Sequence, residues 1–149
     1  MDELIDVLTS FKHVSMVMRQ IVDEAAKEVN LGAGQLFILQ YLETAHCVNM
    51  TELLGHLRMS NASISILVDK LVKRNLVQRK YSEIDRRRVV LSLSDKGHDM
   101  LRSVFAADAK LMQRLSELFT LPDGELEQLL RIHQHILLNS ESGGTHFEC

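Results

Sequence analysis

The chain has 149 residues, a formal net charge of −3, 46% hydrophobic residues and a single proline. This length suits one domain with a sizeable core, and the hydrophobic fraction excludes a disordered chain. The sequence contains no apolar run of the roughly 18 residues that a membrane span needs, and it starts with acidic residues, unlike a signal peptide. We therefore expect a soluble cytoplasmic protein without membrane contact, whose two cysteines, Cys47 and Cys149, are free thiols.

Positive charge gathers in one segment of the chain. Residues 51–90 contain nine lysines and arginines against four acidic residues, a net charge of +5 that leaves −8 for the remainder. Such asymmetry indicates one face for a polyanion and a different task for the rest of the molecule.

The sequence predicts three helices in the first part of the chain, the third of which runs into this basic segment. Apolar residues recur every three or four positions over residues 3–29, which predicts a helix of about seven turns. That stripe is longer than one small core requires, so we expect it to pack against a partner subunit. A second helix is expected at residues 33–45. A third, short helix begins at Asn49, a good N-cap with Glu52 three residues later.

A fourth helix is expected from its cap, Ser60, to Asn75. Its larger apolar residues share one face of a helical wheel, and the opposite face is small and lightly polar near the N-terminus. A helix that enters the major groove of DNA needs that shape, because bulky groups would hold its backbone away from the base edges. An ordinary surface helix with small residues is the alternative.

Two strands are expected next, at residues 77–82 and 89–93, joined by a charged tip. Arg86, Arg87 and Arg88 follow one another in this tip, which is costly in self-repulsion unless the loop is solvated or faces phosphates. Asp85 is expected to pair with a nearby arginine and to hold the shape of the tip.

The remaining residues predict two further helices, at 95–119 after the cap Ser94 and at 122–139 starting with Pro122, followed by a flexible tail at 140–149. The expected fold is a single domain, 1–149, mainly α-helical with a small antiparallel β-hairpin wing. It is a winged helix-turn-helix with six helices. The DNA-binding unit covers about 33–93, and helices 3–29 and 122–139 form a dimer.

The segment from Leu57 to Gly97 resembles the MarR-type transcriptional regulators. The matching strings are Ser63-Ile64-Ser65, Leu67-Val68-Asp69-Lys70-Leu71, Leu76-Val77, Asp85-Arg86-Arg87 and Leu93-Ser94-Asp95-Lys96-Gly97. The order and length of the expected elements also match, up to about residue 139. Two positions depart from the family pattern: Ile66 stands where many relatives have arginine, and Asn75 replaces the usual glycine.

The resemblance implies an obligate homodimer on a palindromic operator of double-stranded DNA, with recognition helices in successive major grooves and wings in flanking minor grooves. It also implies that a small-molecule effector, a metal or an oxidant relieves repression. By position it carries over Ser63, Ser65, Asp85, Arg86 and Arg87. The full set of residues expected to contact DNA is Asn61, Ser63, Ser65, Ile66, Lys73, Arg79, Lys80, Arg86, Arg87 and Arg88.

An effector pocket is expected where the first, second and fifth helices meet. Its candidate lining residues, which are more often plain core, are Phe11, Met16, Met18, Phe37, Tyr41, Met100 and Phe105. Cys47 is a candidate redox switch. The seven histidines show no tight spacing of metal ligands, so no metal site and no cofactor are predicted from the sequence.

Three other functions remain open. The chain contains no glycine-rich phosphate loop, nucleophile elbow or metalloprotease helix, so an enzyme is not expected. A metal- or redox-responsive regulator of the same fold is one alternative to a ligand-responsive repressor. A winged-helix scaffold for protein contacts, without DNA binding, is the other.

Overall fold

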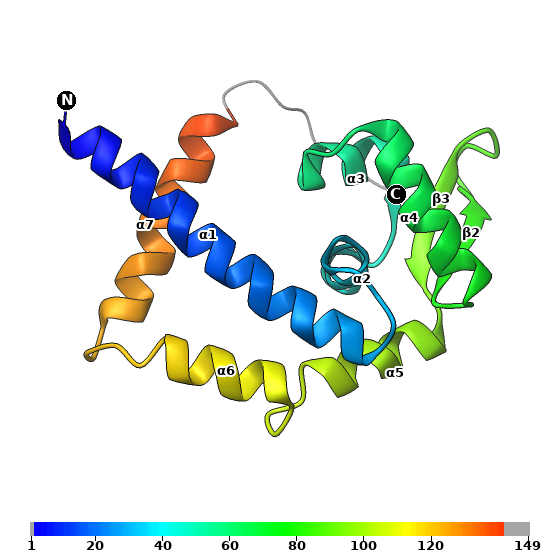
Figure 1. The fold of residues 1–149 in the computed structure, drawn as a ribbon. Coiled ribbons are helices and arrows are strands. Elements are labelled where there is room, and N and C mark those ends of the chain that lie inside the picture. The colour runs from blue at the N-terminus through cyan, green and yellow to red at the C-terminus, as the bar shows by residue number, and fades with distance from the viewer. Residues whose placement is uncertain (1, 142–149) are drawn as a thin grey trace.

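The computed structural model describes residues 2–141, which form seven helices and three short strands (Figure 1). The helices are α1 (Asp2–Glu28), α2 (Ala33–Ala45), α3 (Met50–Leu57), α4 (Asn61–Lys73), α5 (Asp95–Val104), α6 (Lys110–Leu118) and α7 (Glu125–Ser140). The strands are β1 (Val48–Asn49), β2 (Val77–Tyr81) and β3 (Val89–Leu93). The expected mainly helical winged helix-turn-helix is confirmed, with one helix more than predicted.

The core lies around α2, which contacts α1, α3, α4, α5 and β3. In Figure 1 this helix is seen nearly end-on, between α1 and the winged unit. Leu36, Ile38 and Leu39 of α2 are fully buried, and Ile64 and Val68 of α4 join the same core. The broad apolar face that the sequence shows in residues 33–45 is therefore the centre of the domain.

The sheet has three antiparallel strands in the order β1-β3-β2. The expected hairpin is β2 with β3, paired from Val77 with Leu93 to Tyr81 with Val89. The third strand, β1, is not among the elements predicted from the sequence. A two-residue strand has no periodicity to detect, and β1 forms only because Val48 pairs with Leu91.

The helix expected at residues 95–119 is broken in the structure, and that prediction was wrong. The chain leaves α5 at Phe105 and turns through a hydrogen bond from the Ala109 N–H to the Ala106 carbonyl, 2.8 Å long, before α6 begins. Alanine favours helix, so local propensity does not reveal the break. The turn lets α5 pack on α2 and β3 while α6 packs on α1.

The last helix begins at Glu125, three residues later than predicted. Its N-cap is Gly124, whose φ of +84° places it in the left-handed region that glycine tolerates best. Pro122 lies in the preceding turn, where its carbonyl accepts a hydrogen bond from the Glu125 N–H at 3.1 Å. The expected tail starts too early as well, since Ser140 is still helical; residues 142–149 lie outside the described part of the chain.

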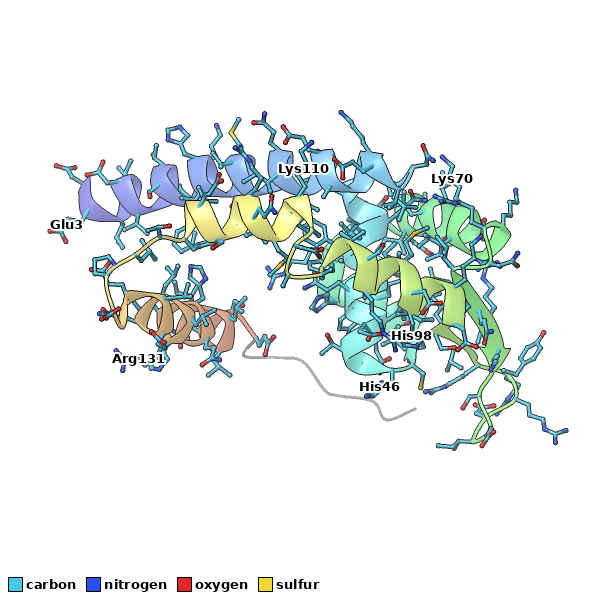
Figure 2. All side chains as sticks on the ribbon, turned by 90° about the horizontal axis from the view of Figure 1, so that it is seen from below. Glu3, His46, Lys70, His98, Lys110 and Arg131 are labelled. Carbon is cyan, nitrogen blue, oxygen red and sulfur yellow. The ribbon has the colours of Figure 1, made fainter. Side chains whose placement is uncertain are left out.

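A helical arm, which we define as residues 2–18 of α1 together with α6 and α7, extends away from the winged unit (Figures 1 and 2). The buried residues of α1 all lie between Ile21 and Ala26, and α7 has no buried residue. The large apolar side chains that the arm and the α6–α7 connection leave exposed are Leu4, Ile5, Val7, Leu8, Phe11, Val14, Met16, Val17, Leu118, Leu121, Leu126, Leu130, Ile132, Ile136, Leu137 and Leu138. Among residues 2–141, no helix is long and apolar enough to cross a membrane.

Candidate nucleic-acid interface

The N-terminal end of α4 carries an ordered set of small polar side chains. Ser60 caps the helix by accepting a hydrogen bond from the Ser63 N–H at 3.2 Å, and its hydroxyl oxygen lies 2.9 Å from that of Ser63. One turn further on, the Ser65 hydroxyl donates to Asn61 Oδ1 at 3.2 Å. These groups are exposed or half-buried, so their remaining hydrogen-bonding capacity faces outward.

The two faces of α4 divide as the helical wheel predicts. Ile64, Val68 and Leu71 are fully buried, whereas the Ile66 side chain is 56% exposed on the outward face. The outward face offers a methyl-rich surface at Ile66, the position that departs from the family pattern. Such a surface suits apolar contact with a thymine methyl group.

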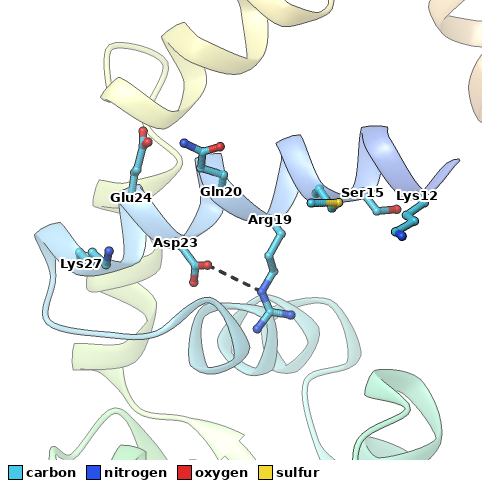
Figure 3. A pocket seen from close by; sticks show the side chains of 8 residues that line it. Lys12, Ser15, Arg19, Gln20, Asp23, Glu24 and Lys27 are labelled. Carbon is cyan, nitrogen blue, oxygen red and sulfur yellow. Dashed lines mark ion pairs between the residues drawn. The ribbon is translucent and has the colours of Figure 1, made fainter. Parts of the chain in front are cut away.

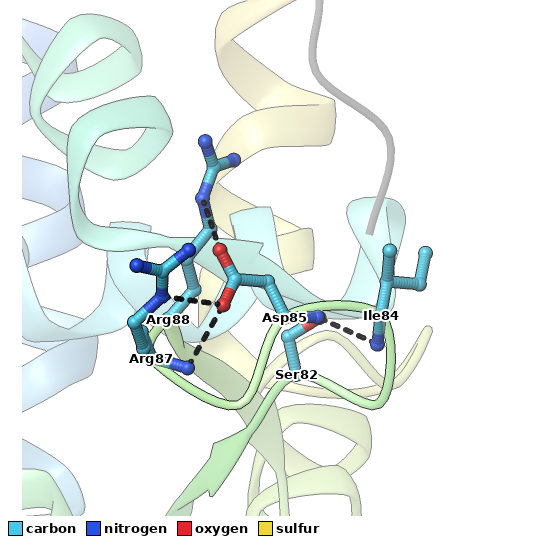
Figure 4. A network of polar contacts seen from close by, with 5 residues as sticks. All are labelled: Ser82, Ile84, Asp85, Arg87 and Arg88. Atoms are coloured by element: carbon cyan, nitrogen blue, oxygen red, sulfur yellow. Dashed lines mark hydrogen bonds and ion pairs between the residues drawn. The ribbon is translucent and has the colours of Figure 1, made fainter.

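The wing tip is folded around Asp85 (Figure 4). Asp85 Oδ1 accepts hydrogen bonds from the Arg87 backbone N–H at 3.0 Å and from Arg87 Nε at 3.4 Å, and Oδ2 lies 3.8 Å from Arg88 Nε. The loop is closed by a hydrogen bond from the Ser82 N–H to the Arg88 carbonyl, 2.8 Å long. Arg87 nevertheless remains 92% exposed, and Arg86 is exposed as well.

The structure joins α4 and the wing through a contact that the sequence analysis missed. Arg79 of β2 forms a charge-assisted hydrogen bond with Asp69 of α4. In the sequence Asp69 is only one of the four acidic residues of segment 51–90, because pairing it with Arg79 requires the packing of α4 on β2. The pair neutralises part of the charge of Arg79, while Lys73 and Lys80 are exposed.

The seven candidate pocket residues do not share one environment. Phe37, Tyr41, Met100 and Phe105 are half-buried against the core, and Met18 is half-buried on α1. By contrast, the side chains of Phe11 and Met16 on the arm are 39% and 60% exposed. Met16 borders a hollow whose eight lining residues all belong to α1 (Figure 3). A hollow with one helix for its wall is an open surface of this subunit.

Two ring contacts join helices near these positions. Phe11 lies against His133 of α7 with ring centroids 5.7 Å apart. Tyr41 of α2 stacks on His56 of α3, with centroids 3.8 Å apart and nearly parallel planes. Burial raises the pKa of Tyr41, with a further contribution from the Glu52 carboxylate, and burial lowers the pKa of His56. Both shifts favour the neutral forms of the stacked rings.

Cys47 takes part in a disulfide bond, so the expectation that it is a free thiol was wrong; Cys149 lies outside the described residues. Within residues 2–141, no three histidine, cysteine or acidic side chains come together in a way that could hold a metal ion. One histidine, His98 of α5, instead pairs with Glu43 of α2.

Comparison with known proteins connects this geometry to a family. Residues 31–89 match the model of the MarR family. The HTH-type transcriptional repressor MdtR of Bacillus subtilis is 24% identical over 115 residues, which cover 77% of this chain and 74% of MdtR. The transcriptional repressor MprA of Escherichia coli is 34% identical over 87 residues, which cover 58% of this chain but only 49% of MprA.

Solved structures show the same fold. The transcriptional regulator BldR from Sulfolobus solfataricus superposes with a TM-score of 0.80 at 22% identity, covering 93% of this chain and 96% of BldR. A mutant MarR from Escherichia coli, solved in complex with operator DNA, superposes with a TM-score of 0.73 at 22% identity, covering 91% and 96% of the two chains. Residues 31–89 of this chain are thus similar to the MarR family of transcriptional regulators, and the chain shares its fold with the Escherichia coli MarR.

Proposed function

We propose that this protein is a repressor that binds a palindromic operator as a homodimer and leaves it when a small-molecule effector binds. One observation carries the DNA-binding part: the polar N-terminal end of α4 and the arginines of the wing belong to one unit. In Figure 1, α4 and the β2–β3 hairpin lie side by side on the side away from the arm. The Asp69–Arg79 contact ties the two together.

We assign the following roles to the predicted residues. Asn61, Ser63, Ser65 and Ile66 contact base edges in the major groove: the first three are small and polar near the N-terminal end of α4, and Ile66 offers its methyl groups on the outward face. Lys73, Arg79 and Lys80 contact phosphates. Arg86, Arg87 and Arg88 enter the minor groove, where a narrow groove attracts arginine, and Asp85 holds the loop that presents them.

The homodimer is supported by the apolar surface of the arm. An amphipathic helix that is not disordered buries its apolar stripe against something, yet α7 buries no residue within one subunit. A second copy of the chain supplies a matching apolar face by symmetry. A two-fold dimer then presents two recognition helices, which is what an operator with two inverted half-sites requires.

The proposal that an effector binds rests on one feature, the half-buried aromatic and methionine residues of α2 and α5. Phe37, Tyr41, Met100 and Phe105 border the core beneath the winged unit, and methionine adapts readily to ligands of different shapes. An effector of apolar or aromatic character fits this lining.

Selection of DNA by the protein tests the proposal. Purified protein is incubated with random duplexes, and the retained sequences are determined and then tested by gel shift at two salt concentrations. We expect an inverted repeat bound by a dimer. Retention of no preferred sequence, or binding by a monomer, overturns the proposal. Adding a panel of aromatic compounds to the preformed complex then tests for release.

A further inference from the structure

The C-terminal end of α4 is fastened to the C-terminal end of α1. Arg74, the C-cap residue of α4, donates from Nη1 to the Asn30 carbonyl at 2.7 Å and from Nη2 to the Val29 carbonyl at 3.0 Å. These two carbonyls follow the last turn of α1, where C=O groups lack partners within the helix and carry partial negative charge. A side chain of α4 thus caps α1.

The same residue is also held from α5. The Arg74 carbonyl accepts a hydrogen bond from Lys96 Nζ at 3.1 Å, and Lys96 is the second residue of α5. Beside it, the hydroxyl of Ser94, the N-cap of α5, donates to the Asn75 carbonyl. The ends of three helices therefore meet at Arg74: α1 and α5, which lead to the arm, and α4.

An arginine makes this junction stiffer than another cation does. Its guanidinium is planar, and two of its nitrogens contact adjacent carbonyls, so the contact restrains rotation as well as distance. The acceptors are backbone atoms, which do not change rotamer. Two guanidinium nitrogens are already engaged, and the side chain is half-buried, so Arg74 is a poor candidate for a direct phosphate contact.

Because the contacts of Arg74 lie at the C-terminal end of α4, a small change in them moves the opposite end of this helix. This helix has 13 residues, so it is roughly 20 Å long at about 1.5 Å per residue. A tilt of about 5° around its C-terminal end therefore moves the end that carries Ser63 by roughly 1.5 Å. Hydrogen bonds to bases tolerate only about 0.5 Å of variation in length.

We propose that Arg74 is a positioning residue for operator binding: it holds α4 at the angle set by α1, and so fixes the distance between the two recognition helices of the dimer. This inference rests on the proposed function, because that distance matters only for a dimer on an operator with two half-sites.

The test uses duplexes selected by the native protein, with the two half-sites moved one base pair closer or further apart, and a duplex with a single half-site. Arg74→Ala and Arg74→Lys are compared with the control Arg102→Ala, which removes an exposed arginine from α5. We expect Arg74→Ala to reduce the preference for native spacing by at least about fivefold. Binding to the single half-site and the salt dependence stay unchanged.

Arg74→Lys keeps the charge but not the two-point contact, so we expect a smaller loss of spacing preference from it than from Arg74→Ala. If Arg74→Ala lowers the melting temperature too far for binding assays, Arg74→Lys decides alone. An unchanged spacing profile overturns the proposal, and so does equal weakening on all duplexes with a shallower salt dependence, which marks a phosphate contact. If the native protein itself shows no spacing preference, the proposed function fails instead.

Discussion

A single carboxylate shapes the wing without cancelling its positive charge. Asp85 accepts a hydrogen bond from the Arg87 backbone and pairs with the Arg87 and Arg88 side chains, yet Arg87 keeps 92% of its side-chain surface exposed. An exposed pair of this kind contributes under about 1 kcal/mol to stability. Its effect is therefore on the geometry of the loop, and the guanidinium groups stay available to a polyanion.

Replacing Arg86 or Arg87 by alanine tests the wing at this scale. We expect Arg86→Ala and Arg87→Ala each to weaken operator binding by about 1–2 kcal/mol, because each removes an exposed cation from the tip. Thermal unfolding should not change, since neither side chain is part of the core. Gel shifts and melting curves measure the two effects, with Arg102→Ala as the control. If both variants bind the operator as tightly as the native protein does, the arginines of the wing do not contribute to DNA binding.

The Tyr41–His56 stack predicts a dependence of stability on pH. Burial lowers the pKa of His56, so the folded protein holds this proton less tightly than the unfolded chain does. The unfolded state then binds more protons once the pH falls below about 6.5, and the free energy of unfolding decreases from there down to the folded pKa.

Urea denaturation at about pH 7 and about pH 5 measures this effect. We expect His56→Gln to lose less stability on acidification than the native protein does. Equal losses in the two proteins would mean that His56 does not contribute to the pH dependence.

At the scale of single elements, the three helices α3, α4 and α5 begin directly after the N-cap residues predicted from the sequence. Asn49 Oδ1 accepts a hydrogen bond from the Glu52 N–H at 2.8 Å, and Glu52 Oε2 accepts one from the Asn49 N–H at 3.0 Å, which completes the expected capping box. Ser60 and Ser94 cap α4 and α5 by accepting hydrogen bonds from the Ser63 and Gly97 N–H groups. Caps involve residues two or three positions apart, which is why sequence reasoning finds them.

Gly97 permits the close approach of α5 to the chain entering β2. A Cβ atom at this position would lie 2.2 Å from the Leu76 carbonyl oxygen, a backbone atom that cannot move aside cheaply. We expect Gly97→Ala to lower the free energy of unfolding by roughly 1–3 kcal/mol, as overpacking does.

The matched control is Gly55→Ala in α3, where a Cβ atom would meet nothing within 4 Å. It should stabilise the protein by up to about 1 kcal/mol, because alanine favours helix over glycine. Urea denaturation compares the two variants, and equal effects in both would contradict the close approach at Gly97.

For the whole molecule, the distribution of apolar surface separates two parts. The winged unit buries its apolar residues around α2, whereas the arm leaves its own exposed. Positive charge follows the winged unit, and the remainder of the chain is acidic. We therefore expect the winged unit to contact a polyanion and the arm to contact a second subunit.

Placing a charge on the arm tests the dimer. Leu130 on α7 is 56% exposed, and we expect Leu130→Glu to yield monomers, because a carboxylate buried in an apolar interface is strongly disfavoured. Light scattering coupled to gel filtration measures the mass. Ile84→Glu is the control, since Ile84 is 80% exposed on the wing tip and outside the arm. A native mass for the Leu130→Glu variant would argue against an interface at α7.

Salt dependence reports on the charged face as a whole. Every phosphate neutralised on binding releases counterions, and each contributes about 0.9 to the slope of log K against log salt concentration. We expect a steep slope for the native dimer, and one that is shallower by about 1 per neutralised phosphate lost in Lys73→Ala. A nearly flat plot for the native protein would contradict binding through phosphates.

The sequence by itself determined the local features of this protein: the caps at Asn49, Ser60 and Ser94, the two faces of α4, and the two five-residue strands of the wing. These follow from interactions between residues a few positions apart, which periodicity and composition record. The tertiary structure alone decided the turn at residues 105–109, the pairing of Val48 with Leu91, the Asp69–Arg79 contact and the capping of α1 by Arg74. Each of the last three joins segments that meet only after the chain has folded, and the turn exists because α5 and α6 pack on different helices, so no local pattern encodes them.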